Sequence, residues 1–181
     1  ISSPSEFGNP DAVLLPGTKN TIQDLLWLRQ NGLEAKILQH AGRGGLVFGI
    51  CGGYQMLGLS VSDPEGAEQK GTVKGLGLLP VRTVFRQEKR RTRVQGHFRR
   101  LTGMLEGMSG AAIEGYEIHM GESYPAGSEP GDTAPRGAAS AKSGEGEHGS
   151  SENGHALVEF TEETARGEYP ALRADGAQCG N

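Results

Sequence analysis

Cys51 is the residue whose surroundings point most directly to chemistry. It stands in the segment Gly49-Ile50-Cys51-Gly52-Gly53, after an apolar run and before residues that begin like a helix. A nucleophile between a strand and a helix, with glycines around it, is the arrangement of a nucleophile elbow with cysteine in place of serine. Glycines suit this turn because side chains beside the nucleophile would clash with the adjoining strand and helix.

The predicted position of Cys51 also favours a reactive thiol. The dipole and free N–H groups at a helix N-terminus stabilise a thiolate, which can attack a carboxamide. The N–H of Gly52 is placed to stabilise the resulting oxyanion, and Gly17, in the turn after a neighbouring strand, is the natural second donor. A free cysteine is most often buried and inert. Ligand sites in parallel sheets lie at the carboxyl ends of strands, however, so Cys51 is predicted to be functional and Cys179 incidental.

The elements that must position Cys51 alternate between strand and helix. Residues 12–15 are an apolar run closed by Pro16-Gly17, which predicts a buried strand. A helix is expected from Asn20 or Thr21 until Gly32, followed by a second helix over 34–40. Residues 46–50 form the next predicted strand. This order predicts an α/β fold with a parallel sheet and right-handed crossovers.

The rest of the chain predicts further strands and one long insertion. Strands are expected at residues 75–81, 93–98, 116–120 and 156–160. The basic run at 89–91 is interpreted as a solvated turn or a protected sheet edge. Residues 125–155 contain no Val, Ile, Leu, Met, Phe, Trp or Tyr, so this stretch is predicted to be a disordered surface insertion.

Composition limits the classes of function. A chain of 181 residues with 35% apolar residues and one Trp suits one α/β domain over 1–181. The net charge of −4 gives no electrostatic reason to bind nucleic acid or an anionic membrane. No membrane-spanning run, secretion signal or metal-binding cysteine spacing is visible, so we expect a cytoplasmic protein without a metal site.

Residues 49–58, Gly-Ile-Cys-Gly-Gly-Tyr-Gln-Met-Leu-Gly, resemble the nucleophile motif of class I glutamine amidotransferase domains. From Gly52 onward they resemble the cobyric acid synthase family in particular. Other segments look like that family's motifs and follow its order: 15–21 with Asp24-Leu25, 63–66, 75–80 and 115–121. The resemblance covers about 11–121, and Asp175-Gly176-Ala177 is similar to the segment before the family's final strand. It implies a flavodoxin-like fold with a mostly parallel central sheet flanked by helices.

The resemblance also implies a reaction and a set of site residues. Glutamine is the expected substrate, and Cys51 takes ammonia from it. The residues expected to bind substrate or support the site are Thr18, Gly53, Gln55, Tyr116 and His119. In the family, an N-terminal synthetase domain uses ATP and Mg to amidate corrinoid carboxylates in cobalamin biosynthesis. This chain has no Walker-type sequence, so no cofactor is expected in this domain and the corrinoid is expected to bind elsewhere.

The chain departs from the family at the catalytic base. A triad-type amidotransferase uses a histidine to take the thiol proton, and in the family it follows the segment resembled by 175–177. We therefore expect the 181-residue chain to lack this base and to release no ammonia at a measurable rate. His40, His97, His148 and His155 are interpreted as helix, strand or low-complexity residues. His119 is expected to support the site, and any turnover by this chain would make it the candidate base.

Several alternatives stay open on the sequence alone. The amidotransferases of cobyrinic acid diamide synthase and of lipid II amidation are similar around the cysteine. An α/β hydrolase or a cysteine peptidase can use the same elbow, and a domain without its triad can serve as a binding module.

Overall fold

The computed structural model describes residues 1–101, 103–127, 158–163 and 172–175, and these fall into two compact units. Unit 1 consists of Ile1–Glu88 with Met120–Ala126. Unit 2 consists of Lys89–His119 and the described residues from Gly127 onward.

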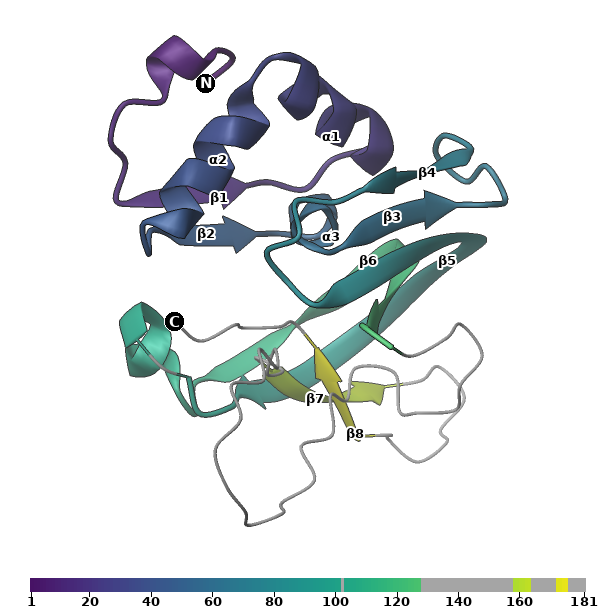
Figure 1. The fold of residues 1–181 in the computed structure, drawn as a ribbon. Coiled ribbons are helices and arrows are strands. Elements are labelled where there is room, and N and C mark those ends of the chain that lie inside the picture. The colour runs from purple at the N-terminus through teal and green to yellow at the C-terminus, as the bar shows by residue number, and fades with distance from the viewer. Residues whose placement is uncertain (102, 128–157, 164–171, 176–181) are drawn as a thin grey trace. The chain divides into compact units, whose positions relative to one another are not determined.

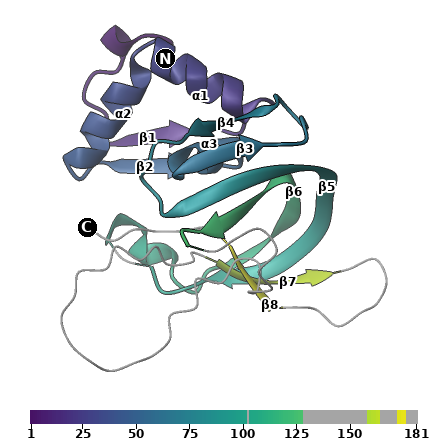
Figure 2. The ribbon, with the colours of Figure 1, turned by 45° about the vertical axis from the view of Figure 1, so that its right-hand side comes forward.

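Unit 1 begins with the alternation of strand and helix predicted from the sequence (Figure 1). Its first elements are η1 (Pro4–Glu6), β1 (Ala12–Leu15), α1 (Thr21–Gln30), α2 (Leu33–Gly42), β2 (Leu46–Gly49) and α3 (Gly52–Leu57). β1 and β2 pair in parallel, with Val13 opposite Val47 and Leu15 opposite Gly49. Both helices α1 and α2 lie on the same side of this pair of strands (Figures 1 and 2).

Helix α1 starts where its capping residues predict. The side chain of Asn20 accepts a hydrogen bond from the N–H of Gln23 at 2.9 Å, which satisfies one of the free donors of the first turn. Asp24 also lies in this turn, where the helix dipole favours a negative charge. The helix buries Ile22 and Leu25, the apolar positions that face the interior of the unit.

The remaining strands form a mixed arrangement. They are β3 (Ser60–Asp63), β4 (Gly71–Lys74), β5 (Val81–Phe98), β6 (Ala112–Pro125), β7 (Val158–Glu163) and β8 (Leu172–Asp175), with η2 (Gly103–Met108) before β6. In unit 1, β3 pairs in parallel with β5 and antiparallel with β4. In unit 2, β7 pairs antiparallel with both β5 and β8. The predicted α/β class is confirmed, but parallel pairs do not dominate among the described strands.

The prediction of a strand at 75–81 is wrong for residues 75–80. Only Val81 lies in a strand, because β5 begins there. Residues 75–79 instead bend around the end of α3. The N–H of Leu76 donates to the carbonyl of Met56 at 2.8 Å, and the N–H of Leu78 donates to that of Leu57 at 2.8 Å. The carbonyls in the last turn of a helix lack partners within it, and this segment supplies them.

The other predicted elements are found within longer strands. Residues 93–98 belong to β5, 116–120 to β6, and 158–160 to β7. The basic run at 89–91 lies inside β5 and not in a turn. Of the predicted insertion, Pro125 ends β6, while 128–155 lie outside the described residues, so its disorder stays a prediction.

Unit 1 has an apolar core built from β1, β3, β5, the helices α1, α2 and α3, and the segment before β5. The buried apolar side chains of this unit are Leu15, Ile22, Leu25, Leu33, Ile37, Met56, Leu57, Val61, Leu76, Leu79, Val81 and Phe85. Each fully buried side chain of this kind stabilises the fold by about 1.5–3 kcal/mol relative to its exposed state. No helix in the described ranges is long and apolar enough to cross a membrane.

Candidate active site

Cys51 sits at a strained turn between β2 and α3. Its φ of 52° makes it the one non-glycine residue with a positive φ in the part of the chain that the structure describes. The ψ of −112° takes it away from the left-handed helical region that non-glycine residues tolerate best. Hydrogen bonds on both sides hold the turn: Ile50 N–H to the carbonyl of Leu15 at 2.9 Å, and Gln55 N–H to the carbonyl of Cys51 at 3.0 Å. The Cys51 side chain is exposed.

The glycines around Cys51 are required by close packing. A Cβ added to Gly53 would lie 2.1 Å from the carbonyl oxygen of Leu15, on the neighbouring strand. A Cβ added to Gly49 would lie 2.5 Å from the backbone nitrogen of Tyr54, in α3. Both contacts are with backbone atoms, which cannot rotate away. The strand, the turn and the helix therefore approach one another more closely than any side chain permits.

The turn after β1 packs against the cysteine. A Cβ on Gly17 would lie 3.5 Å from the Cβ of Cys51, and a Cβ on Gly52 would lie 2.5 Å from Cγ2 of Thr18. Gly52 is the first residue of α3, so its N–H has no acceptor within the helix. The structure thus brings Gly17, Thr18, Cys51 and Gly52 together at the carboxyl ends of β1 and β2.

The polar side chains beside this turn make contacts within the protein. The hydroxyl of Thr18 donates to the carboxylate of Asp24 and accepts from the N–H of Asn20 at 3.2 Å. Gln55 is buried, and its Oε1 accepts a hydrogen bond from Oγ1 of Thr21 at 3.4 Å. The Thr18 contacts lie within the start of α1, and the Thr21–Gln55 contact joins that start to α3. The supporting roles of Thr18 and Gln55 stay predictions.

The other predicted site residues belong to unit 2. Tyr116 and His119 lie on β6, with Tyr116 exposed and His119 half-buried. The roles of both residues stay predictions.

Of the remaining histidines, His97 belongs to unit 2, and only His40 can be compared with Cys51 within one unit. In unit 1 the only histidine is His40, whose Nε2 is 3.1 Å from the carbonyl oxygen of Leu46. Its ring meets that of Phe7 edge to face at 6.3 Å. His148, which is followed by Gly149, and His155 lie outside the described residues. The expected absence of the family's base is therefore still a prediction.

Two carboxylates near the site have roles that the sequence did not predict. Asp63 is fully buried and accepts from the N–H groups of Ala67 and Glu68, each at 2.8 Å, and of Gln69 at 2.9 Å. Burial acts to raise the pKa of Asp63, but backbone N–H groups outweigh it and leave that pKa lowered. Glu68 accepts from the N–H of Thr21 at 2.6 Å. The motif at 63–66 marked this segment in the sequence but did not predict the hydrogen bonds that Asp63 and Glu68 make.

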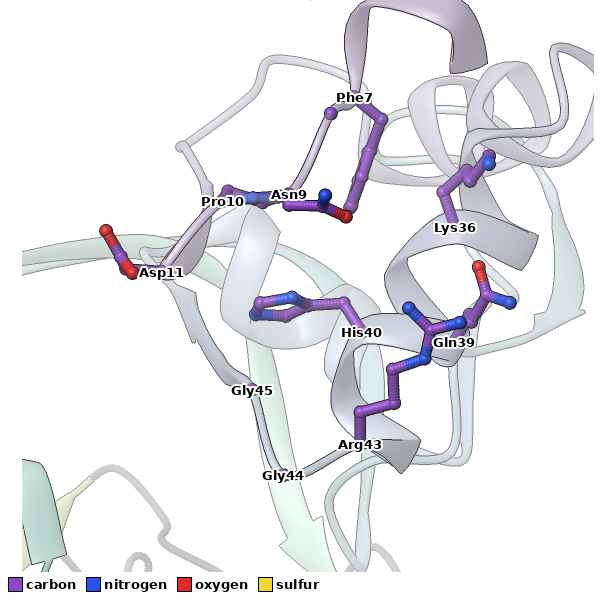
Figure 3. A pocket seen from close by; sticks show the side chains of 11 residues that line it. Phe7, Asn9, Pro10, Asp11, Lys36, Gln39, His40, Arg43, Gly44 and Gly45 are labelled. Carbon is purple, nitrogen blue, oxygen red and sulfur yellow. The ribbon is translucent and has the colours of Figure 1, made fainter.

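A separate hollow of about 520 Å³ lies at the other end of the strands (Figure 3). Lys36, His40 and Arg43 line it, together with Asp11, which precedes β1, and Gly45, which precedes β2. The hollow is thus at the amino ends of the two strands, whereas Cys51 follows the carboxyl end of β2. No group of His, Cys, Asp and Glu side chains in the described ranges is arranged to hold a metal ion.

Comparison with known proteins identifies several relatives. Residues 1–158 match the CobB/CobQ-like glutamine amidotransferase domain. A cobyric acid synthase of Ruminiclostridium cellulolyticum is 54% identical over 121 residues, which are 67% of this chain and 24% of the relative. A cobyric acid synthase of Lachnoclostridium phytofermentans is 56% identical over 123 residues, 68% of this chain and 24% of the relative.

A solved structure described as a glutamine amidotransferase aligns with a TM-score of 0.44 at 21% identity, over 65% of this chain and 56% of its own. The chain spans about a quarter of the length of the curated relatives.

Proposed function

The chain belongs to the family of CobB/CobQ-like glutamine amidotransferase domains, and on that premise we propose that Cys51 is the nucleophile that takes ammonia from glutamine. The observation that carries this proposal is the positive φ of Cys51. This strained residue lies in a turn whose neighbouring positions, Gly49 and Gly53, have no room for a side chain. Strain of this kind costs about 1–3 kcal/mol and is kept where function requires it. The cysteine is exposed at the carboxyl ends of parallel strands, where ligand sites of α/β folds lie.

The reaction begins with attack of the Cys51 thiolate on the side-chain amide carbon of glutamine. The carbonyl oxygen takes up the negative charge, and the N–H groups of Gly52 and Gly17 stabilise it. The tetrahedral intermediate collapses as its nitrogen receives a proton and leaves as ammonia, which gives a glutamyl thioester. A water molecule then attacks the thioester, releasing glutamate and restoring the thiol. The sum is glutamine plus water to glutamate plus ammonia.

Proton transfer in this cycle needs a base, which is a histidine in triad-type amidotransferases. His40 does not suit the role, because it is bonded to the carbonyl of Leu46 at the opposite end of the strands from Cys51. We therefore place the base outside unit 1.

The names of the relatives support a proposal for the use of the ammonia. Because the chain matches about a quarter of proteins named cobyric acid synthase, we propose that the full-length protein also contains an ATP- and Mg-dependent synthetase domain. That domain would use the ammonia to amidate carboxylates of a corrinoid. Glutamine is then the substrate of the domain described here, and the corrinoid binds elsewhere in the protein.

A glutaminase assay on the full-length protein tests the proposal. Ammonia and glutamate are measured with glutamine as substrate, and hydrolysis of a simple ester and of a peptide is measured in parallel. We expect equal amounts of ammonia and glutamate and no ester or peptide cleavage above that of a Cys51→Ala variant. Cleavage of the ester or peptide by a Cys51-dependent route, without ammonia release, would instead show a hydrolase or a peptidase.

A further inference from the structure

The end of β3 and the loop that follows it carry three carboxylates. Asp63, the last residue of β3, binds the backbone of the loop, Glu65 contacts β5, and Glu68 reaches the start of α1. We propose that Glu68 is a positioning residue for the reaction at Cys51, holding the turn that carries Gly17 against the nucleophile. This inference rests on the function proposed above and adds to it a residue from outside the strand–turn–helix segment.

The contact made by Glu68 is short and partly buried. Its Oε2 accepts a hydrogen bond from the backbone N–H of Thr21 at 2.6 Å, across 47 positions of sequence. Thr21 is the first residue of α1, so its N–H has no acceptor within the helix. A charged acceptor makes a stronger hydrogen bond to such a donor than a neutral one does. Glu68 therefore fixes the point at which the turn of residues 16–20 enters α1.

Thr21 in turn packs against the nucleophile's helix. A Cβ added to Gly52 would lie 3.1 Å from Oγ1 of Thr21 and 3.2 Å from the backbone nitrogen of Thr18. The backbone of Thr18 and the side chain of Thr21 thus both pack on the first residue of α3. Gly17 precedes Thr18 and faces the Cβ of Cys51. A shift of Thr21 would move the proposed oxyanion donor of Gly17 relative to the thiol.

The loop has the rigidity that a positioning element needs. Three backbone N–H groups converge on the buried carboxylate of Asp63 and fix the path of the chain up to Gln69. Glu65 accepts from the N–H of Gln87 at 3.2 Å and pairs with Arg86 at 3.4 Å, which ties the far side of the loop to β5. Glu68 thus projects from a backbone that is held independently of α1.

The burial of Glu68 agrees with this role. Desolvation raises the pKa of its carboxyl, and the nearby charges of Asp63 and Asp24 act in the same direction, against the hydrogen bonds from Thr21. A carboxylate in such surroundings is poorly solvated, so its hydrogen bond to the Thr21 N–H is the interaction that offsets its burial. Misplacement of a reacting group by about 1 Å costs as much as 100-fold in rate, so a single positioning contact can be measured kinetically.

The test uses the full-length protein and a chloroketone analogue of glutamine, from which the Cys51 thiolate displaces chloride to form a thioether. The saturation constant and the maximal rate of labelling are measured for the wild type, Glu68→Ala and Glu68→Gln, with iodoacetamide as a reagent that needs no oxyanion site. We expect Glu68→Ala to lower the maximal rate by about tenfold or more and to leave the iodoacetamide rate unchanged. Glu68→Gln keeps an acceptor oxygen and should restore most of the rate.

Two further variants sharpen the result. Gln69→Ala, on the same loop, is the matched control: it removes an exposed side chain but keeps the backbone N–H that binds Asp63, so it should be labelled like the wild type. Glu68→Asp keeps the charge but shortens the side chain by one methylene, so it should react slowly even if Glu68→Ala does not fold.

The inference is overturned if Glu68→Asp and Glu68→Ala are labelled at the wild-type rate, if both reagents slow equally, or if Glu68→Gln is as slow as Glu68→Ala. If labelling of Cys51 in the wild-type full-length protein does not saturate with the analogue, the proposed function is overturned, and this inference with it.

Discussion

Cys51 combines a proposed role in chemistry with a backbone conformation that costs stability. Its backbone has a φ of 52° and a ψ of −112°, a combination that glycine adopts freely and other residues avoid. The fold retains the cysteine at a position where glycine would be more stable. At the residue scale, stability and the proposed function therefore oppose each other, and substitutions at Cys51 can separate them.

We expect Cys51→Gly to stabilise the chain by about 1 kcal/mol, because glycine relieves the backbone strain. Cys51→Ala should give no comparable gain, since alanine keeps the strained φ and serves as the control. Urea unfolding of the three proteins measures the difference in free energy of unfolding. Equal stability of the glycine and alanine variants would show that the turn is not strained.

The packing around Gly53 predicts a loss of stability on substitution. In Gly53→Ala, the new Cβ would lie 2.1 Å from the carbonyl oxygen of Leu15, so β1 and α3 must separate. We expect a loss of about 1–3 kcal/mol, as for overpacked cores. Gly42→Ala is the matched control: nothing lies within 4 Å of its added Cβ, and alanine favours the helix there. A Gly53→Ala variant as stable as Gly42→Ala would contradict the close packing of the turn.

At the scale of elements, the β3–β4 loop depends on the charge of one buried carboxylate. Asp63 accepts three backbone hydrogen bonds through its two oxygens, and Asn at this position would turn an N–H₂ group toward at least one donor. We expect Asp63→Asn to cost about 1–3 kcal/mol near neutral pH. Asp11→Asn, at an exposed aspartate before β1, is the control. Urea unfolding checks both.

The contribution of Asp63 should depend on pH in a defined direction. Its pKa in the folded chain lies below the ordinary value of 3.8, so the folded state favours the charged form. The stabilisation is then fully present above pH 3.8 and is lost as the pH falls through the lower folded value. The stability difference between wild type and Asp63→Asn should therefore shrink in acid. A difference that is constant with pH would show that the charge of Asp63 is not responsible.

The elements that local patterns define were predictable from sequence. The run at 12–15 gave β1, the cap at Asn20 gave the start of α1, and the glycines around Cys51 gave the turn into α3. The segment at 75–79 was not predictable, because its leucines are buried as in a strand while its N–H groups bond to the end of α3. A hydrophobic pattern predicts which residues are buried but not where their backbone groups bond. Here the N–H groups bond to carbonyls of α3, about 20 positions earlier in the sequence.

The same limit applies to the candidate site. The sequence identified Cys51 and the glycines that pack around it, because the chemistry and the steric requirement are both local. It did not identify Glu68, whose partner Thr21 lies 47 positions away. A glutamate in a polar loop is usually solvated, and only the fold shows that this one is bonded to a helix N-terminus.

At the scale of the whole molecule, the chain corresponds to one part of longer proteins among its relatives. It spans about a quarter of proteins named cobyric acid synthase, and its proposed chemistry supplies ammonia and does not consume it. A nucleophile that serves only the release of ammonia should be dispensable when ammonia is added directly. Adding ammonia directly therefore separates the proposed role of Cys51 from any effect of a substitution on the synthetase reaction.

Amidation by the full-length protein, measured with glutamine and with ammonium salt as alternative nitrogen donors, tests the role of Cys51 most directly. For Cys51→Ala, we expect the glutamine-dependent rate to fall by about 10⁴-fold or more, as for loss of a catalytic nucleophile, while the ammonia-dependent rate stays that of the wild type. Full glutamine-dependent activity in Cys51→Ala, or loss of both activities together, would contradict the assignment of Cys51 as the nucleophile that releases ammonia.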